Sequence, residues 1–123
     1  MSDLPRFAFG DSPELADELL ALVLEGKKTA TCWAVSEGEK GAAVGARWIV
    51  NDGEGRARVI LETMELTRRS FEEVGTDFAH DEGEGDRSLA YWRAAHRDYF
   101  TRNGGFAEGM ELYCERFRLA EVL

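Results

Sequence analysis

The stretch EGKKTATCW, residues 25–33, marks the point at which the chain is predicted to change from a helix to a strand. Ser-Pro-Glu at residues 12–14 is a typical helix start, because serine caps a helix, proline suits its first position and glutamate favours its positive end. Apolar residues then recur at spacings of three and four, which predicts one buried face made of Leu15, Leu19, Leu22 and Val23. Gly26 favours the left-handed conformation that ends many helices. We therefore predict a helix over residues 13–25 and a strand over residues 29–35.

Two further strands are predicted in the middle of the chain. Residues 36–45 are rich in glycine and charge and predict a loop. The runs at residues 47–51 and 56–66 are β-like, and the Asp-Gly within residues 52–55 is a hairpin signal between them. In the second run both alternating sets of side chains contain apolar residues, so we expect this strand to be covered on both sides.

Helices are predicted again in the second half. Residues 70–74 resemble a short helix, with a serine and a glutamate at the spacing of a capping box. Residues 76–88 are acidic, and we expect a flexible segment in which Asp86 caps the next helix. That helix covers residues 89–100, and one of its faces carries Trp92, His96 and Tyr99. Such a face is typical of a core contact, with a titrating role for His96 in a pocket as the alternative.

The terminal segment, residues 110–123, alternates between apolar and polar side chains and predicts a long strand with a bulge near residues 115–116. No internal repeat or linker divides the chain. The order of helices and strands favours a single α+β domain over residues 1–123, built on a small mixed or antiparallel sheet curled around one core.

Composition narrows the classes of function. Twenty-four acidic against fifteen basic residues give a formal net charge of −9, which opposes strong non-specific binding to nucleic acid, and no DNA partner is expected. Eight of the cations lie between residues 27 and 69, so a local basic site stays open. The N-terminus has no leader-like pattern, and no apolar run approaches the roughly 20 residues that span a bilayer. We therefore expect a cytoplasmic protein without a membrane partner.

The two cysteines, Cys32 and Cys114, lie far apart in the sequence, and two buried thiols are favoured over a disulfide in the cytoplasm. Together with two scattered histidines they form no zinc pattern. The acidic segment at residues 76–88 lacks the regular spacing of a calcium loop. No metal or other cofactor is expected, and the oligomeric state is not indicated.

The chain resembles the ASCH superfamily, whose members are small domains with a PUA-like β-barrel fold. The family motif is Gly-x-Lys-x-x-Thr-x-Arg after the first helix, and here it reads Gly26-Lys-Lys-Thr-Ala-Thr-Cys-Trp33. Three of the four motif positions match, and Trp33 stands at the arginine position. The preceding helix, the acidic FAHDEGEGD segment, the YWRAAHRDYF helix and the terminal strand also resemble one ASCH subgroup, so the resemblance covers almost the whole chain.

The resemblance implies contact with RNA or with nucleoside-like ligands. Some members are amidohydrolases that remove the acetyl group from N4-acetylcytidine with a lysine, a threonine and a glutamate, and others have been described as ribonucleases. The lysine and the threonine correspond to Lys28 and Thr31 in the motif, and the glutamate corresponds to Glu82, with Glu84 close enough to compete. Lys28 is then the base, Thr31 the nucleophile and Glu82 the acid or orienting group, with no cofactor required.

The chemistry of these residue types is consistent with that assignment, on one condition. A threonine hydroxyl is inert without an adjacent base, and a lysine serves as that base if burial lowers its pKa from about 10.4. On a regular strand Lys28 and Thr31 point to opposite faces, so they converge only if the chain bends at residues 27–29. The alternative is that Lys27 and Lys28 neutralise the negative helix end and the threonines simply favour a strand.

Other residues are candidates for contact with a nucleoside or RNA. Trp33 carries no charge, but it can stack on a base or pack in the core. The remaining candidates for contact with phosphate are cationic or amide side chains: Lys27, Arg47, Arg102 and Asn103. Glu84 is a second acidic candidate. The sequence thus favours a small amidohydrolase of N4-acylated cytidine, with an RNA-binding module or a ribonuclease as the alternatives.

Overall fold

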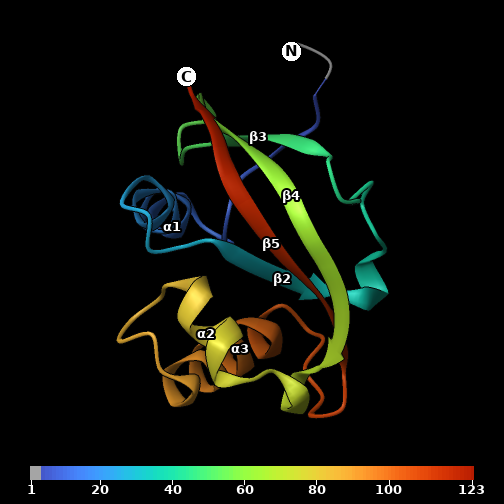
Figure 1. Ribbon diagram of the computed structural model, residues 1–123. Coiled ribbons are helices and arrows are strands. Elements are labelled where there is room, and N and C mark those ends of the chain that lie inside the picture. The colour runs from blue at the N-terminus through green and yellow to red at the C-terminus, as the bar shows by residue number, and fades with distance from the viewer. Residues whose placement is uncertain (1–3) are drawn as a thin grey trace.

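The computed structural model describes residues 4–123 and shows a five-stranded sheet with helices packed against it (Figure 1). Residues 1–3, the start of the N-terminal stretch for which no leader is predicted, lie outside the described residues. In chain order the elements are β1 (Arg6–Phe7), α1 (Pro13–Leu24), β2 (Ala30–Ala34), β3 (Arg47–Asn51), β4 (Ala57–Ser70), α2 (Thr76–Glu82), α3 (Leu89–Arg102) and β5 (Glu111–Val122). Short 3-10 helices cover Val35–Glu37 and Phe71–Glu73.

The sheet has the strand order β1-β3-β4-β5-β2, with β1 parallel to β3 and every other neighbouring pair antiparallel. This arrangement confirms the predicted α+β class with mixed strands. Within residues 4–123 the sheet does not close into a hydrogen-bonded circle, so β1 and β2 are both edge strands. The two-residue strand β1 was not predicted, because so short a segment carries no periodic signal.

The longest strands, β4 and β5, pair along most of their length and form the centre of the sheet (Figure 1). The prediction that β4 ends at residue 66 was wrong, because Ser70 still pairs with Glu111. Thr63 pairs with Phe117 and Glu65 with Arg116, so the extra residue opposite the predicted position, Met64, is on β4. A second register shift, between Ile60 and Leu61, leaves Ala120 of the terminal strand unpaired, four residues beyond the predicted position.

Helix α1 forms as predicted. The Ser12 hydroxyl accepts a hydrogen bond from the Leu15 amide at 3.1 Å, and Pro13 begins the helix. Its apolar face packs on one side of the sheet in a cluster formed by Phe9, Leu19, Leu20, Val23, Val50, Val59, Leu61 and Phe117. The position of α1 thereby fixes where the segment after Gly26 enters β2.

Helices α2 and α3 pack together at the other end of the sheet (Figure 1). The prediction of a flexible segment over residues 76–88 was wrong, because residues 76–82 form α2 and bury Phe78 and Ala79. Ser88, and not Asp86, caps α3 by accepting from the Tyr91 amide, while Asp86 accepts from the Ser88 amide. The core beneath the two helices contains Ala30, Phe71, Val74, Phe78, Ala79, Trp92, Phe100, Leu112 and Cys114.

The capping box predicted at the start of the short helix is present. The Ser70 amide and the Ser70 hydroxyl both donate to Glu73 Oε1, at 3.0 Å and 2.9 Å.

Cys32 and Cys114 lie directly opposite each other on β2 and β5, and both are free thiols. Among residues 4–123 no helix is both long and apolar enough to cross a membrane.

Candidate functional site

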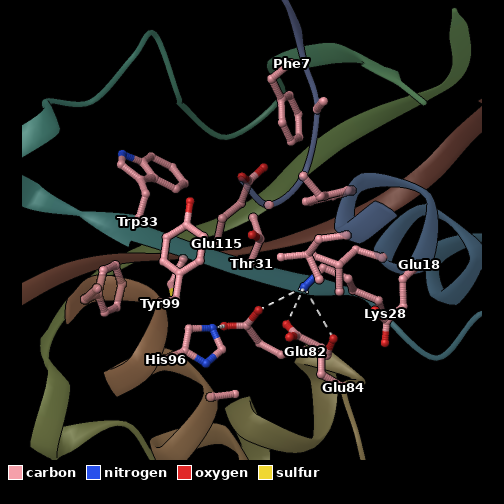
Figure 2. Close-up of a pocket in the computed structure, with 18 of the residues that line it drawn as sticks. Phe7, Glu18, Lys28, Thr31, Trp33, Glu82, Glu84, His96, Tyr99 and Glu115 are labelled. Atoms are coloured by element: carbon pink, nitrogen blue, oxygen red, sulfur yellow. Dashed lines mark hydrogen bonds and ion pairs between the residues drawn. The ribbon is translucent and has the colours of Figure 1, made fainter. Parts of the chain in front are cut away.

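A pocket of about 690 Å³ lies around the free edge of β2 (Figure 2). One wall comes from β1 and α1, and the facing wall comes from the end of α2 and from α3. The segment 28–33 contributes Lys28, Thr31, Cys32 and Trp33. Because the pocket wraps around the edge of the strand, residues that alternate along β2 reach the same cavity.

Lys28 lies at the centre of the pocket, on the irregular segment between α1 and β2. Its side chain is only 1% exposed. The ammonium Nζ lies 2.9 Å from Glu82 Oε1, 3.3 Å from the Glu82 carbonyl oxygen and 3.4 Å from Glu84 Oε2 (Figure 2). The pocket therefore contains a buried ion pair between residues 54 positions apart in the sequence.

The backbone at the end of α2 makes this pair possible. Gly83 has a φ of +78°, and a Cβ atom there would lie 2.4 Å from the Lys27 carbonyl oxygen. Only glycine fits this close approach in the left-handed conformation. The chain before β2 is tied to the same place, since the Thr29 amide donates to the Asp81 carbonyl at 2.7 Å.

Glu82 is the acceptor around which the site is organised. Besides the Lys28 ammonium on Oε1, the Trp92 indole donates to Oε2 at 2.9 Å, and His96 Nε2 lies 3.4 Å from Oε2. Burial opposes the charge of Glu82, but the attraction of Lys28 and His96 together with the Trp92 and Lys28 hydrogen bonds keeps its pKa below the usual 4.5. Glu82 is therefore a fixed anion in the resting site.

The same pairing acts on Lys28. Burial alone would lower its pKa, yet the carboxylates of Glu82 and Glu84 outweigh burial, and the pKa is raised above 10.5. The condition for Lys28 to act as a base, a pKa lowered by burial, is not met in the resting site. Lys28 is an ammonium there, suited to stabilising negative charge rather than to taking a proton.

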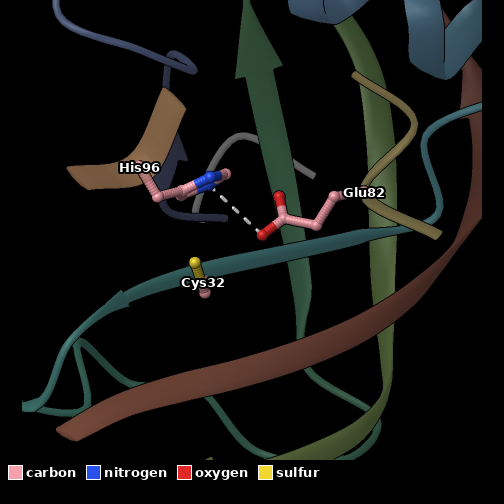
Figure 3. Close-up of side chains that lie close together, drawn as sticks. All are labelled: Cys32, Glu82 and His96. Carbon is pink, nitrogen blue, oxygen red and sulfur yellow. Dashed lines mark ion pairs between the residues drawn. The ribbon is translucent and has the colours of Figure 1, made fainter. Parts of the chain in front are cut away.

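Cys32, Glu82 and His96 offer three possible metal-ligand atoms within 4.8 Å of one another (Figure 3). The Glu82 carboxylate already holds Lys28 and Trp92, and burial followed by the nearby Glu82 charge raises the Cys32 thiol pKa well above its usual value. His96 stacks on Trp92 with ring centroids 4.3 Å apart. A metal ion on Oε2, the Glu82 oxygen that lies 3.4 Å from His96 Nε2, would compete with the Trp92 indole, so we assign this cluster to the support of Glu82.

Thr31 faces the pocket from β2, and its directly opposite partner on β5 is Glu115. Glu115 is buried, with 7% of its surface exposed, and it also lines the pocket. The Thr63 hydroxyl on β4 donates to Glu115 Oε2. Burial raises the pKa of the Glu115 carboxyl above 4.5, and the Thr63 hydrogen bond only partly opposes this.

Aromatic side chains form much of the remaining wall, among them Phe7, Trp33 and Tyr99 (Figure 2). Trp33 lines the cavity and does not belong to either buried core cluster. Its indole donates to the Gly38 carbonyl at 2.9 Å, and its ring centroid lies 5.5 Å from that of Tyr113. Flat apolar walls of this kind suit a planar ring.

The structure brings most of the predicted site residues together. Six of them line the one pocket: Lys28, Thr31, Trp33, Glu82, Glu84 and Arg102. Arg102 is engaged by Asp11 at 2.7 Å and by Asp98. The bend required for Lys28 and Thr31 to converge is present, because β2 begins only at Ala30.

Three predicted contact residues lie elsewhere. Lys27 is exposed and pairs with Glu25 at 3.4 Å, and Arg47 pairs with Glu62 at 3.1 Å on β3 and β4. Asn103 donates to Asp11 and to the Tyr99 carbonyl just after α3. None of the three lines the pocket in the described chain.

Sequence reasoning missed Glu115 as a site residue. The signal was present: Glu115 falls on the same side of the terminal strand as Phe117, at a spacing of two, where an apolar residue is expected. The aromatic and carboxyl groups of β1 and α1, such as Phe7 and Glu18, were also missed, because nothing local links them to the motif.

A stability measurement checks the environment of Glu115. The native carboxyl keeps its proton at pH values where the unfolded one is ionised, so stability should fall as the pH rises from 4.5 through the native pKa. Glu115→Gln keeps an acceptor for Thr63 without a charge, and we expect it to be about 1–2 kcal/mol more stable than the wild type near pH 8. Urea unfolding at several pH values, with exposed Glu121→Gln as the control, tests this. Equal pH slopes for wild type and Glu115→Gln would contradict it.

Known proteins share this architecture. The sequence profile of the ASCH domain matches residues 5–121. The ASCH domain from Lactobacillus crispatus JV V101 is 31% identical with a TM-score of 0.87, and the alignment covers 96% of this chain and 80% of that one. A protein from Enterococcus faecalis V583 is 29% identical with a TM-score of 0.85, over 96% of this chain and 77% of that one.

A more distant structure, ASCH from Zymomonas mobilis, shares the fold at 13% identity with a TM-score of 0.63, over 97% of this chain and 68% of that one. No curated protein matches the chain in sequence. The fold and the site thus define a small α+β domain with a pocket at an open strand edge. The chain belongs to the ASCH domain family.

Proposed function

We propose that the protein is a small amidohydrolase that removes the acyl group from an N4-acylated cytidine. The observation that carries this proposal is the shared pocket: the buried Lys28–Glu82 pair and the Thr31 hydroxyl line one cavity. The aromatic walls and the volume of about 690 Å³ suit a nucleoside, which is a planar base on a sugar. The reaction needs no metal or organic cofactor.

Each of the three residues has a role that fits its surroundings. Thr31 is the nucleophile, and Lys28 is the cation that stabilises the oxygen of the acyl group as negative charge develops on it. Glu82 orients Lys28. The contact of Lys28 with Glu84, at 3.4 Å with the Glu84 side chain 19% exposed, is the one that a substrate oxygen would replace. This revises the role of base that the resemblance implied for Lys28.

The charge around the pocket favours a small neutral substrate over a polyanion. The acidic lining residues outnumber the basic ones: Glu18, Glu37, Glu82, Glu84, Asp98 and Glu115 against Lys28, Lys40 and Arg102. All three cations are already paired with carboxylates. RNA binding or RNA cleavage would require free cations to neutralise phosphates, and this is why we rank those functions second.

The first experiment incubates the purified protein with N4-acetylcytidine and follows the release of cytidine by liquid chromatography. We expect release by the wild type at a rate that barely changes between low and high salt, because the substrate is neutral. The matched control is Lys40→Ala, which removes a cation from the rim of the same pocket without touching the buried pair. If no cytidine is released and short single-stranded RNA binds with a steep salt dependence, the RNA-binding alternative replaces this proposal.

A further inference from the structure

Glu115 has features that a purely structural residue does not need. Its carboxyl group is buried in the pocket wall, and no cation pairs with it among the described residues. Only the Thr63 hydroxyl donates to it, on Oε2, which leaves Oε1 without a donor in the described chain. A buried carboxyl group with one free oxygen is costly, since burial without a charge partner opposes ionisation.

The strand register places this carboxyl group beside Thr31. Residues directly opposite each other on antiparallel strands point to the same face, with Cβ atoms about 4.5–5.5 Å apart. Figure 2 shows the Glu115 carboxyl group and the Thr31 hydroxyl on the same side of β2, both within the cavity. The register thus makes Thr31 and Glu115 direct neighbours on one face of the sheet, inside the cavity.

Neither Lys28 nor Glu82 is available to take the proton of the Thr31 hydroxyl. Lys28 is held as an ammonium by Glu82 and Glu84, and the Glu82 oxygens accept from Lys28 and Trp92. Within residues 4–123 the Thr31 hydroxyl takes part in no side-chain hydrogen bond, so no group of the described chain accepts its proton in the resting site. A carboxylate that lacks a cation partner is a stronger base than one that holds an ammonium.

Resting on the proposed function, we infer that Glu115 is a further catalytic residue: it takes the proton of the Thr31 hydroxyl and returns it to the nitrogen that leaves. Thr63 holds the carboxylate in place through Oε2 and leaves Oε1 toward Thr31. The fold thereby separates two tasks, with proton transfer on the β5 side of β2 and charge stabilisation by Lys28 on the side of α2.

The proton and electron changes balance over two steps. In the first, the Thr31 oxygen bonds to the acyl carbon as its proton moves to Glu115, and the carbonyl electron pair moves to the oxygen beside Lys28. The carbon–nitrogen bond then breaks, and the Glu115 proton passes to N4 of the departing cytidine. In the second step, water attacks the acyl-threonine ester, with its proton moving to Glu115 and then to the Thr31 oxygen, which releases the carboxylic acid.

The test uses p-nitrophenyl acetate, an activated ester that can acetylate Thr31 without a cytidine substrate. Acetyl transfer to Thr31 is measured by peptide mass spectrometry in the full chain, beside cytidine release from N4-acetylcytidine. We compare the wild type with Glu115→Gln, which keeps the volume and the Thr63 hydrogen bond, and with exposed Glu121→Gln as the matched control. Thermal unfolding confirms that each variant is folded.

We expect Glu115→Gln to slow acetylation of Thr31 on the order of 100-fold or more, with Glu121→Gln unchanged. Acetylation of Thr31 that is equally fast in Glu115→Gln would overturn the inference, as would a wild type that neither becomes acetylated on Thr31 nor hydrolyses the ester. Because the ester reports on Thr31 directly, its result stands apart from the choice of natural substrate. Acetylation that depends on Glu115, without cytidine release by the wild type, would support Glu115 as the base and reject only N4-acetylcytidine.

Discussion

A Lys28→Met variant should lose about 3–5 kcal/mol of unfolding free energy at neutral pH, because it leaves the Glu82 carboxylate buried without its ammonium partner. Methionine fills a similar volume, so the loss reports mainly on the unpaired charge. Urea unfolding followed by fluorescence measures the change. The same variant should lose hydrolysis of the acylated nucleoside, because the cation that stabilises the developing oxyanion is gone.

The pH dependence separates this effect from poor packing. In the wild type the pKa of Glu82 is lowered, so its contribution is complete above 4.5 and is lost as the pH falls through the native value. In Lys28→Met only His96 and the Trp92 hydrogen bond still oppose burial, the largest influence on the Glu82 pKa, so we expect that pKa to rise. The variant should then regain stability as the pH falls from 7 toward 4.5. Lys28→Met with Glu82→Gln removes both charges and should restore much of the loss at neutral pH. A deficit that is constant with pH would indicate packing and not charge.

Thr31→Val should reduce the release of cytidine by a factor on the order of 10⁴ or more, because the nucleophilic oxygen is absent. The side chain keeps its shape and its strand preference, and Thr31 is only partly buried, so stability should change by less than about 1 kcal/mol. Steady-state kinetics by liquid chromatography give the rate, and calorimetric titration with cytidine shows whether the pocket still binds the base.

Thr31→Ser is the matched control, since it keeps a hydroxyl at the same strand position and should retain measurable turnover. Thr29→Val is a second control on the same segment, where the side chain is exposed and outside the pocket. Substantial activity in Thr31→Val would exclude an acyl-threonine intermediate and would direct attention to a water nucleophile in the same cavity.

The elements that could be predicted from the sequence are those whose causes are local. Helix α1 has its cap, its apolar spacing and its terminal glycine within 15 residues, and the β3–β4 hairpin has its turn signal between the strands. Helix α2 has no such pattern, because acidic residues surround the two apolar residues that it buries, Phe78 and Ala79. Its existence depends on the core beneath it and not on its own composition.

The same distinction between local and non-local causes applies to the residues of the site. Lys28 and Thr31 were identified through the motif, and Glu82 through the resemblance, because the ion pair joins segments whose approach no local pattern predicts. The spacing from Phe117 marks Glu115 as inward-facing, but only the register of β2 against β5 places it opposite Thr31. The bulge between β4 and β5 decides which side chains of β4 share that face, and bulges leave almost no trace in composition.

The position of β2 in the sheet also governs when the site can form during synthesis. Within the described chain, β2 pairs only with β5, the last of the five strands in chain order. Until residues 111–122 emerge, the strand that carries Thr31 has no neighbour to order it, although its residues were made some 80 positions earlier. Assembly of the pocket therefore waits for the synthesis of β5, and a nascent chain stalled before β5 presents the motif without a working site.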